Sequence, residues 1–386
     1  MMRIDETWLT NPATQAVCKA IEAGGFQALF VGGCVRNALI GAPVNDIDLS
    51  TDARPEDVVK LAEKAGIKAV PTGIDHGTVT LVKDDIPHEV TTFRMDIETD
   101  GRRAVIAFSD NVEEDAARRD FTMNALYARP DGTVLDPLNG MPDLVARRVR
   151  FIGKAEDRIH EDYLRSLRYF RFHAWYGDDQ AGFDPEALSA IALNLDGLSR
   201  LSHERIGAEM LKLLAAPDPA PSVAAMRSTG ALAQLLPGSD DRALAPLVHQ
   251  ESLVGVGPDG LRRLTALGAL DVANALRLSR AQTARVAKLS QAVGSLADPA
   301  ELGYRLKQTD ATDALLLRSA MLEQPMPPNA ANLIEQGAQA KFPVQARDLM
   351  PAYQGPALGT RMKALEAAWI ASGFALTKAE LLKHPD

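Results

Sequence analysis

The pattern of apolar and polar positions changes along the chain and separates it into two parts. Before residue 143, short apolar runs predict strands that lie between helical segments. The predicted strands cover residues 28–31, 46–49, 77–82, 88–93 and 133–135, and the predicted helices cover residues 11–24, 34–40, 55–65 and 118–126. Beyond residue 143 apolar residues recur with the period of a helix. We therefore expect an α+β fold with a small mixed sheet in its N-terminal part and an all-helical remainder.

Three segments carry more specific expectations. Residues 95–117 are polar and charged, with Gly101-Arg102-Arg103 among them, and they predict a flexible surface loop that gates a neighbouring site. Residues 155–176 have a strong helical pattern and predict one continuous helix. The run Pro217-Asp218-Pro219-Ala220-Pro221 predicts a linker or a sharp corner before further helices.

The stretch from residue 30 to residue 49 holds the strongest candidate chemistry. Gly32 and Gly33 lie between a predicted strand and a predicted helix, where free backbone N–H groups attract phosphate. Asp46 and Asp48 share one face of the next strand, because side chains at i and i+2 point the same way. Two such carboxylates repel unless a cation lies between them, and Mg²⁺ prefers oxygen ligands that include substrate phosphates. The stretch therefore predicts phosphoryl or nucleotidyl transfer.

Glu89 adds a third acid if the predicted hairpin of residues 77–82 and 88–93 lies beside the strand of Asp48. Each feature also has an ordinary interpretation. The two glycines are compatible with a simple turn, and the three acids are compatible with solvated strand edges. Their occurrence together in one short βαβ-like span favours a functional site.

Arginines gather between residues 147 and 171, although the formal net charge of the whole chain is −9. Arg165, Arg168 and Arg171 recur every three residues and form one helical stripe, which Asp162 joins. An Asp162–Arg165 ion pair on a solvated helix is the alternative interpretation. Three arginines in series instead favour an anionic ligand.

Composition restricts the class of protein. A chain of 386 residues predicts two to four domains, and 46% hydrophobic residues are ample for packed cores. Cys18 and Cys34 are too few for a disulfide framework or a zinc site. The first residues contain no apolar run, and no stretch has the length of a membrane span, so a cytoplasmic protein without membrane contact is expected. The negative net charge argues against a generally basic protein that coats nucleic acid.

Four motifs in sequence order resemble one family. They are Gly-Gly-Cys-Val-Arg with Asp-Ile-Asp-Leu, Glu-Val-Thr-Thr-Phe-Arg, Arg-Arg-Asp-Phe-Thr-Met-Asn-Ala, and Glu-Asp-x-x-Arg-x-x-Arg. Their combination resembles the bacterial tRNA nucleotidyltransferase and poly(A) polymerase family, the class II CCA-adding enzymes of the polymerase β-like superfamily. The resemblance implies a nucleotidyltransferase head over residues 1–142, a helical neck over 143–216, a helical body over 217–335 and a tRNA-binding tail over 336–386.

The resemblance also implies a role for each matching residue of the head. Asp46 and Asp48 are expected to hold the catalytic Mg²⁺ ions, with Glu89 as a candidate third acid. Gly33 and Arg36 are expected to take the triphosphate of the incoming nucleotide, next to Gly32. Further head residues expected to bind the nucleotide, at its phosphate and ribose, are Arg118, Arg119, Asp120 and Asn124.

In the neck, the resemblance implies that Asp162 and Arg165 read the incoming base and that Arg168 and Arg171 support it. This role has a chemical rationale. Cytosine and adenine both offer an exocyclic amine donor beside a ring-nitrogen acceptor, which an Asp acceptor beside an Arg donor complements. Uracil and guanine present the opposite order and would leave buried groups unpaired.

The expected reaction is template-independent addition of C, C and A to the 3′ end of tRNA from CTP and ATP, by two-metal catalysis with release of pyrophosphate. Alternatives are a poly(A) polymerase, a partial CC- or A-adding enzyme, a nucleotidyltransferase that acts on a protein or small molecule, and a non-catalytic RNA-binding relative.

One residue departs from the family pattern. The family usually has an acid after Val-Arg, where this chain has Asn37. Asn37 still offers a hydrogen-bond acceptor, but a charge role there is in doubt.

Overall fold

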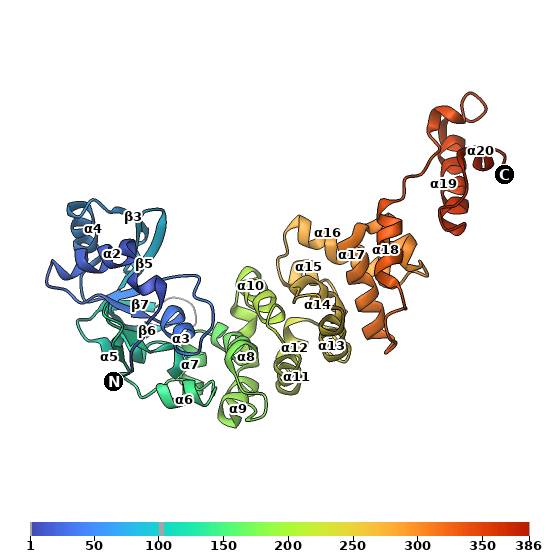
Figure 1. Cartoon of the computed structure of the whole chain (residues 1–386). Helices are drawn as coiled ribbons and strands as arrows, with labels where there is room; N and C mark the ends of the chain where they lie inside the picture. The colour runs from blue at the N-terminus through green and yellow to red at the C-terminus, as the bar shows by residue number, and fades with distance from the viewer. Residues whose placement is uncertain (1, 100–103, 386) are drawn as a thin grey trace. The chain divides into compact units, whose positions relative to one another are not determined.

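The computed structural model describes residues 2–99 and 104–385, which form two compact units. One unit comprises Met1–Pro237 with Asn274–Arg277, and the other comprises Gly238–Ala273 with Leu278–Asp386 (Figure 1). The first unit continues past the corner predicted at Pro217, because α11 (Ala220–Thr229) belongs to it. The finer division into head, neck, body and tail remains a prediction.

A seven-stranded mixed sheet with the order β3-β4-β5-β2-β1-β8-β9 forms the N-terminal part of the first unit. Its strands are β1 (Leu29–Val31), β2 (Asp48–Thr51), β3 (Lys68–Gly73), β4 (Thr78–Lys83), β5 (Ile86–Thr92), β8 (Tyr127–Ala128) and β9 (Val134–Leu135). Strand β2 runs parallel to β5, whereas the other neighbouring strands are antiparallel. The α+β prediction is confirmed, and the predicted hairpin of β4 and β5 lies beside β2 as expected.

Three helices pack close to this sheet: α2 (Pro12–Glu22), α3 (Gly33–Leu39) and α4 (Pro55–Lys64). Pro12 occupies the first turn of α2, where its missing N–H costs no hydrogen bond, and the Asn11 side chain accepts from the Ala13 N–H. Buried residues of α2 recur at helical spacing and include Val17 and Ile21. α2 and α4 contact β4 and β5, so they cover the half of the sheet that carries Glu89.

The prediction of a loop over residues 95–117 is wrong. Strands β6 (Arg94–Thr99) and β7 (Ala104–Phe108) pair as an antiparallel hairpin, and α5 (Val112–Ala117) follows. The signal for this hairpin is the alternation of apolar residues before the charged stretch and the continuous apolar run of residues 104–108 after it. The Gly101-Arg102-Arg103 part of that prediction lies outside the described residues.

The helix predicted from residue 118 is also wrong. Only a single 3₁₀ turn, η2 (Thr122–Asn124), forms there. The backbone of this segment pairs instead with a distant one: the Thr122 N–H donates to the Arg150 carbonyl, and the Ile152 N–H donates to the Asp120 carbonyl. Tertiary pairing therefore overrides local helix propensity, and it ties the arginine motif to the start of the helical part.

The continuous helix predicted over residues 155–176 is interrupted. Helix α7 (Ala155–Glu161) ends at Asp162, and α8 (Leu164–Tyr176) begins after Tyr163. Asp162 has extended backbone angles of φ −155° and ψ 107°, and its Oδ1 accepts the Leu164 N–H at 3.1 Å. An aspartate can hydrogen-bond nearby backbone in this way instead of continuing a helix. The break removes Asp162 from the arginine stripe.

The rest of the first unit is helical, with α6 (Met141–Val145), α9 (Pro185–Leu193), α10 (His203–Leu214) and α12 (Ala231–Leu235). Ser202 caps α10 by accepting the Arg205 N–H. Rings of Phe121, Phe151, Tyr169 and Phe172 pack together between the arginine motif and α8, with centroids 4.8 to 6.2 Å apart. This aromatic cluster fixes α8 against the strand-rich part of the unit.

The second unit is built from helices. They are α13 (Leu244–Val254), α14 (Gly260–Ala266), α16 (Arg280–Val293), α17 (Pro299–Met321), α18 (Ala330–Gln339), α19 (Gly355–Ala371) and α20 (Lys378–Leu382); α15 (Val272–Ala275) lies at the boundary of the two units. One apolar core joins α13, α16, α17 and α18, and a second forms around Trp369 and Leu365 of α19. Among residues 2–99 and 104–385, no helix is long and apolar enough to cross a bilayer.

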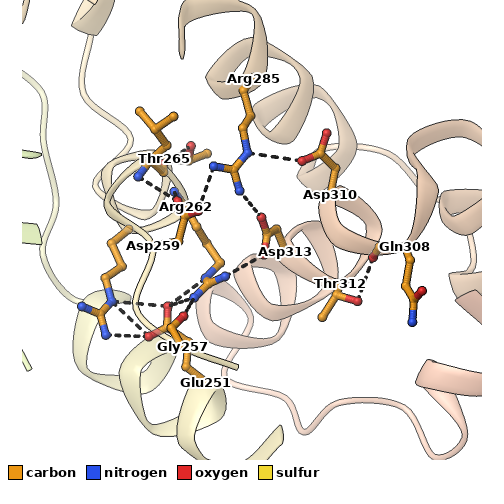
Figure 2. Close-up of polar contacts among 12 residues, drawn as sticks. Glu251, Gly257, Asp259, Arg262, Thr265, Arg285, Gln308, Asp310, Thr312 and Asp313 are labelled. Carbon is orange, nitrogen blue, oxygen red and sulfur yellow. Dashed lines mark hydrogen bonds and ion pairs between the residues drawn. The ribbon is translucent and has the colours of Figure 1, made fainter. Parts of the chain in front are cut away.

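A largely buried ion-pair network lies inside this second unit (Figure 2). Arg262 and Arg263 of α14 are 2% and 1% exposed, and both bind the Glu251 carboxylate of α13 at 2.7 Å. Arg262 also reaches Asp313 of α17 at 2.7 Å, and Arg285 of α16 binds the other oxygen of that aspartate. The network therefore joins four helices, through buried charged residues on α13, α14 and α17 and the partly exposed Arg285 of α16.

Replacing Glu251 with glutamine is expected to lower the free energy of unfolding of this unit by about 3–5 kcal/mol, because two buried guanidinium groups would lose their shared anion. Chemical denaturation followed by circular dichroism measures the loss. Glu335→Gln is the matched control, since Glu335 is exposed on α18 of the same unit. It should cost no more than about 0.5 kcal/mol. Equal stability of the two variants would contradict a structural role for the network.

Candidate active site

Three acids of the first unit meet where β2 lies beside β5. Asp48 is the first residue of β2 and is paired in register with Glu89 of β5, while Asp46 precedes the strand by two residues. The predicted strand over residues 46–49 is therefore shorter at its start. The Ile47 carbonyl still accepts the Glu89 N–H, so this segment continues the ladder beyond the strand. Asp48 is half-buried, and Asp46 and Glu89 are exposed.

The acids of this site lie close together and, in the part of the chain that the structure describes, form no ion pair with a basic side chain, although Arg119 acts on Asp48 from a distance. Burial raises the pKa of Asp48 to about 6, with further increases from Glu89 and Asp46 and an opposing effect from Arg119. Within the described residues, neither Asp46 nor Asp48 forms a side-chain hydrogen bond or ion pair. No group of three His, Cys, Asp or Glu side chains in that part of the chain forms a metal-binding set on its own. These acids therefore fit a hard divalent ion that takes its remaining ligands from substrate and water.

The glycine turn lies next to these acids in the sheet. Strand β1, which pairs with β2, ends at Val31, and Gly32 has φ +70° and ψ −120°, a conformation that residues with a Cβ rarely adopt. A Cβ placed on Gly32 would lie 3.7 Å from both Arg119 Nη1 and Asn124 Oδ1. The predicted phosphate-binding turn and two predicted nucleotide-binding side chains are thus brought together.

Arg36 extends from α3 into the interior and is 5% exposed. Its Nη1 donates to Asn124 Oδ1 at 2.7 Å, and the Asn124 amide donates to Asp120 Oδ1 at 3.1 Å. Asp120 in turn accepts from Arg168 Nε of α8 at 2.7 Å. A continuous hydrogen-bonded chain therefore runs from the glycine turn to the helix that carries the arginine stripe. Asp120 is 6% exposed and accepts hydrogen bonds from both Asn124 and Arg168. Its role at the ribose of the nucleotide stays a prediction.

Arg118 and Arg119 are held by an acid that the sequence analysis did not include. Asp115 of α5 is fully buried and accepts from Arg118 Nε at 2.8 Å, from Arg119 Nη2 at 3.0 Å and from the Tyr127 hydroxyl at 2.7 Å. Although burial raises its pKa, the two arginines and the hydroxyl lower the pKa to about 2. The signal is present in the sequence, since Asp115 precedes the two arginines by three and four residues.

Arg119 also links this acid to the face of β2 that carries Asp48. Its Nη2 donates to Ser50 Oγ at 3.1 Å, and Ser50 lies two residues after Asp48 on the same strand. Residues at i and i+2 of a strand share a face, so the guanidinium lies on the face of Asp48. Its position explains the lowering effect that Arg119 has on the pKa of Asp48.

Asp162 and Arg165 are neighbours of the same site but do not pair with each other. Asp162 Oδ2 accepts from Arg205 Nη2 of α10 at 2.6 Å, whereas Arg165 binds Glu161 and donates through Nη2 to the Arg118 carbonyl at 3.0 Å. The alternative of an isolated Asp162–Arg165 ion pair on one helix is therefore wrong. Arg205 was not predicted from the sequence, because the break between α7 and α8 that exposes Asp162 to it was not predicted.

The remaining stripe residues also have acidic partners. Arg168 binds Asp120, and Arg171 Nε donates to Glu209 Oε2 of α10 at 2.5 Å. The guanidinium groups of Arg36, Arg168 and Arg171 all lie within 5.3 Å of the centroid of the buried Phe172 ring. The structure thus gathers three of the predicted nucleotide-binding arginines around one aromatic side chain.

Comparisons with known proteins agree with this geometry. Residues 28–150 match the family profile described as the poly A polymerase head domain, and residues 182–242 match the one described as the probable RNA and SrmB-binding site of polymerase A. By these matches the chain is similar to the tRNA nucleotidyltransferase and poly(A) polymerase family over parts of its length. Asp46, Asp48, the glycine turn and the 118–124 segment all lie within the residues that match the head-domain profile. A nucleotidyltransferase head implies a divalent metal ion, which the unpaired acids suit.

Individual relatives extend the comparison. The chain is 45% identical over 184 residues to the human mitochondrial CCA tRNA nucleotidyltransferase 1, covering 47% of this chain and 42% of the relative. It is 39% identical over 243 residues to a CCA-adding enzyme of Lactobacillus gasseri, covering 61% and 59%. Among solved structures, the Bacillus stearothermophilus CCA-adding enzyme in complex with CTP has a TM-score of 0.75 at 28% identity, with 94% of each chain covered. The chain thus spans 42% to 59% of the length of these two curated relatives.

Proposed function

We propose that this protein is a CCA-adding tRNA nucleotidyltransferase. The 3′-hydroxyl of a tRNA that lacks its CCA end attacks the α-phosphate of CTP or ATP, and pyrophosphate leaves. Bound Mg²⁺ ions supply a lowered pKa at the attacking hydroxyl and neutralise charge on the triphosphate. The observation that carries the proposal is the half-buried Asp48 beside Glu89 and Asp46, acids with no protein cation between them, one strand away from a glycine turn.

In this proposal, different residues around the site bind the metal and the triphosphate. Asp46 and Asp48 hold the metal, with Glu89 as a third acid at its edge. Gly32 and Gly33 leave the turn without a side chain beside the space for the triphosphate, and Gly32 has a φ of +70° that residues with a Cβ rarely adopt. Arg119 lies on the face of Asp48 and is held there by Asp115, so its charge is available to the phosphates of the nucleotide.

Base selection is assigned to the start of α8. Asp162 supplies an acceptor and Arg165 a donor, which complement the edges of cytosine and adenine. Arg205 holds the Asp162 carboxylate, and Arg165 is anchored to the backbone of Arg118, so both readers keep fixed positions. Because Asp162 and Arg165 keep fixed positions, uracil or guanine would leave their hydrogen-bonding groups unpaired. This accounts for the selection of CTP and ATP without a nucleic-acid template.

The CTP complex of the B. stearothermophilus relative supports a CCA-adding enzyme over a poly(A) polymerase, since the likeness covers 94% of both chains. A tRNA truncated before its CCA, incubated with Mg²⁺ and with CTP and ATP singly and together, tests the proposal. We expect addition of two residues from CTP alone and of a third when ATP is also present. A long tail from ATP alone would instead identify a poly(A) polymerase. Absence of any extension would identify a non-catalytic relative.

A further inference from the structure

Arg119 differs in one nitrogen from Arg36, the other arginine beside the glycine turn. All three side-chain nitrogens of Arg36 donate to described side chains, which are those of Asn37, Asn124 and Tyr176. Arg119 donates through Nε and Nη2 only, and among residues 2–99 and 104–385 its Nη1 has no hydrogen-bond partner. This nitrogen lies 3.7 Å from the position that a Cβ on Gly32 would occupy. The Arg119 guanidinium therefore has a free donor group beside the glycine turn.

Three buried groups hold the other two nitrogens of Arg119. The Tyr127 hydroxyl accepts from Nε at 3.1 Å, whereas Ser50 Oγ and Asp115 Oδ2 accept from Nη2 at 3.1 and 3.0 Å. These three residues belong to β8, β2 and α5, and all of them are fully buried. Because a guanidinium is planar and its N–H groups form a rigid fork, contacts that fix Nε and Nη2 also fix the direction of Nη1.

Asp115 by itself leaves the plane of the Arg119 guanidinium undetermined. Its Oδ1 binds Arg118 at 2.7 Å, and its Oδ2 binds Arg119 Nη2 at 3.0 Å. The carboxylate thus divides its oxygens between two arginines and does not form the bidentate pair that would orient one of them. The neutral acceptors Tyr127 and Ser50 supply the additional contacts that determine the plane.

Tyr127 connects these contacts to the glycine turn. Its hydroxyl donates to Asp115 Oδ2 at 2.7 Å while it accepts from Arg119, and its ring centroid lies 5.4 Å from the guanidinium carbon. Burial raises the pKa of this hydroxyl, so it stays protonated and can donate and accept at the same time. Tyr127 also pairs in the sheet with Val31, the residue before Gly32. The same pair of strands therefore carries the glycine turn and the hydroxyl that orients Arg119.

We propose that Tyr127 is a positioning residue that, together with Ser50, holds the Arg119 guanidinium so that its Nη1 meets a phosphate of the incoming nucleotide at the glycine turn. This assignment rests on the proposed function, because it takes a nucleoside triphosphate as the ligand. It gives two neutral, fully buried side chains an effect on nucleotide binding although neither of them touches the nucleotide.

Isothermal titration calorimetry of the full chain with CTP and with ATP, in Mg²⁺ buffer without tRNA, tests the assignment. Tyr127→Phe keeps the ring and removes the hydroxyl, and it should raise Kd about fivefold, the scale of one neutral hydrogen bond. Ser50→Ala removes one acceptor of Nη2 and should raise Kd about threefold. Arg119→Met removes the donor to the phosphate and should raise Kd about thirtyfold.

A double-mutant cycle separates orientation of Arg119 from a purely structural role. In the Arg119→Met background, Tyr127→Phe should leave Kd unchanged, because the hydroxyl acts on the nucleotide only through the guanidinium. A hydroxyl that only stabilises the fold would still alter binding in that background. Tyr169→Phe is the matched control, since Tyr169 is also fully buried and its hydroxyl accepts the Asp184 N–H at 2.9 Å. It should leave Kd unchanged although it loses a buried hydrogen bond.

An unchanged Kd in Tyr127→Phe, Ser50→Ala or Arg119→Met, or an equal rise in Tyr169→Phe, would overturn the assignment. So would a further rise when Tyr127→Phe is added to Arg119→Met. If wild type binds CTP and the effect of Tyr127→Phe depends on Arg119 while no tRNA is extended, the assignment stands and CCA addition falls. If wild type extends tRNA and all variants bind equally well, only the assignment falls. No binding of either nucleotide by wild type would overturn both.

Discussion

Replacing Asp48 with asparagine is expected to abolish nucleotide transfer and, at the same time, to raise the thermal stability of the metal-free protein. Activity should fall by at least about a thousandfold, the scale on which removal of a central catalytic group acts. Stability should rise because burial and two neighbouring acids disfavour the ionised carboxylate of the folded protein, which asparagine lacks. Nucleotide incorporation and melting temperature in EDTA at pH 7.5 measure the two effects.

The pH dependence of that gain follows from the direction of the shift. The pKa of Asp48 is raised from 3.8 to about 6, so the folded protein binds a proton more readily than the unfolded chain. The penalty for ionisation is therefore complete above pH 6 and vanishes as the pH falls toward 4. The stability advantage of Asp48→Asn should disappear over the same range. Asp84→Asn, in the exposed turn between β4 and β5, is the control and should change neither activity nor stability. An active variant, or one less stable at pH 7.5, would contradict the assignment of Asp48.

Removing the Asp162 side chain is expected to relax the choice of nucleotide rather than to stop transfer. Without the carboxylate, Arg165 has no acceptor beside it at the base edge, and Arg205 loses its partner. The ratio of kcat/KM for CTP over UTP should fall by about a hundredfold, because discrimination that depends on unpaired buried groups disappears with the groups.

Single-nucleotide incorporation with each of CTP, ATP, UTP and GTP measures this ratio. Asp157→Ala is the matched control, since Asp157 is exposed on the same helix α7. It should leave all four values of kcat/KM unchanged. An unaltered rejection of UTP and GTP by Asp162→Ala would remove the neck residues from base selection.

The sequence was informative where a local pattern determines the structure. The period-two runs of residues 77–82 and 88–93 predicted the hairpin β4–β5, and the spacing of Asp46, Asp48 and Glu89 predicted an acid cluster at its neighbour. These predictions depend on strand alternation and on strand pairing over short distances in the chain. Both are strong signals, because a slip by one residue would expose the buried face.

Predictions failed where contacts between distant segments decide the conformation. The 118–126 segment looked helical, but its backbone pairs with residues 150–152. The 155–176 segment has an uninterrupted helical pattern, yet Asp162 stops α7 by binding the backbone of the next helix and Arg205 of α10. No periodicity in one segment encodes a partner that lies tens of residues away.

For the same reason the motifs predicted the arginines but not the side chains that hold them. Arg36, Arg119 and Arg168 were predicted from the motifs, whereas Tyr176 and Arg205 emerged only from the packing of α8 and α10. Asp115 is intermediate, because its helical spacing to Arg118 and Arg119 was available. The motifs thus pointed to the candidate residues, whereas most of the side chains that hold them are brought by elements distant in the chain.

The central claim is that this chain completes the 3′ end of tRNA, and the intact mass of a tRNA product tests it most directly. A transcript that ends before its CCA is incubated with the protein, Mg²⁺, CTP and ATP, and its mass is compared with that of the product formed by Asp48→Asn. We predict that wild type yields one product heavier by two C and one A residues and that the variant yields none. An unchanged mass with wild type, or a distribution of long A tails, would contradict the claim.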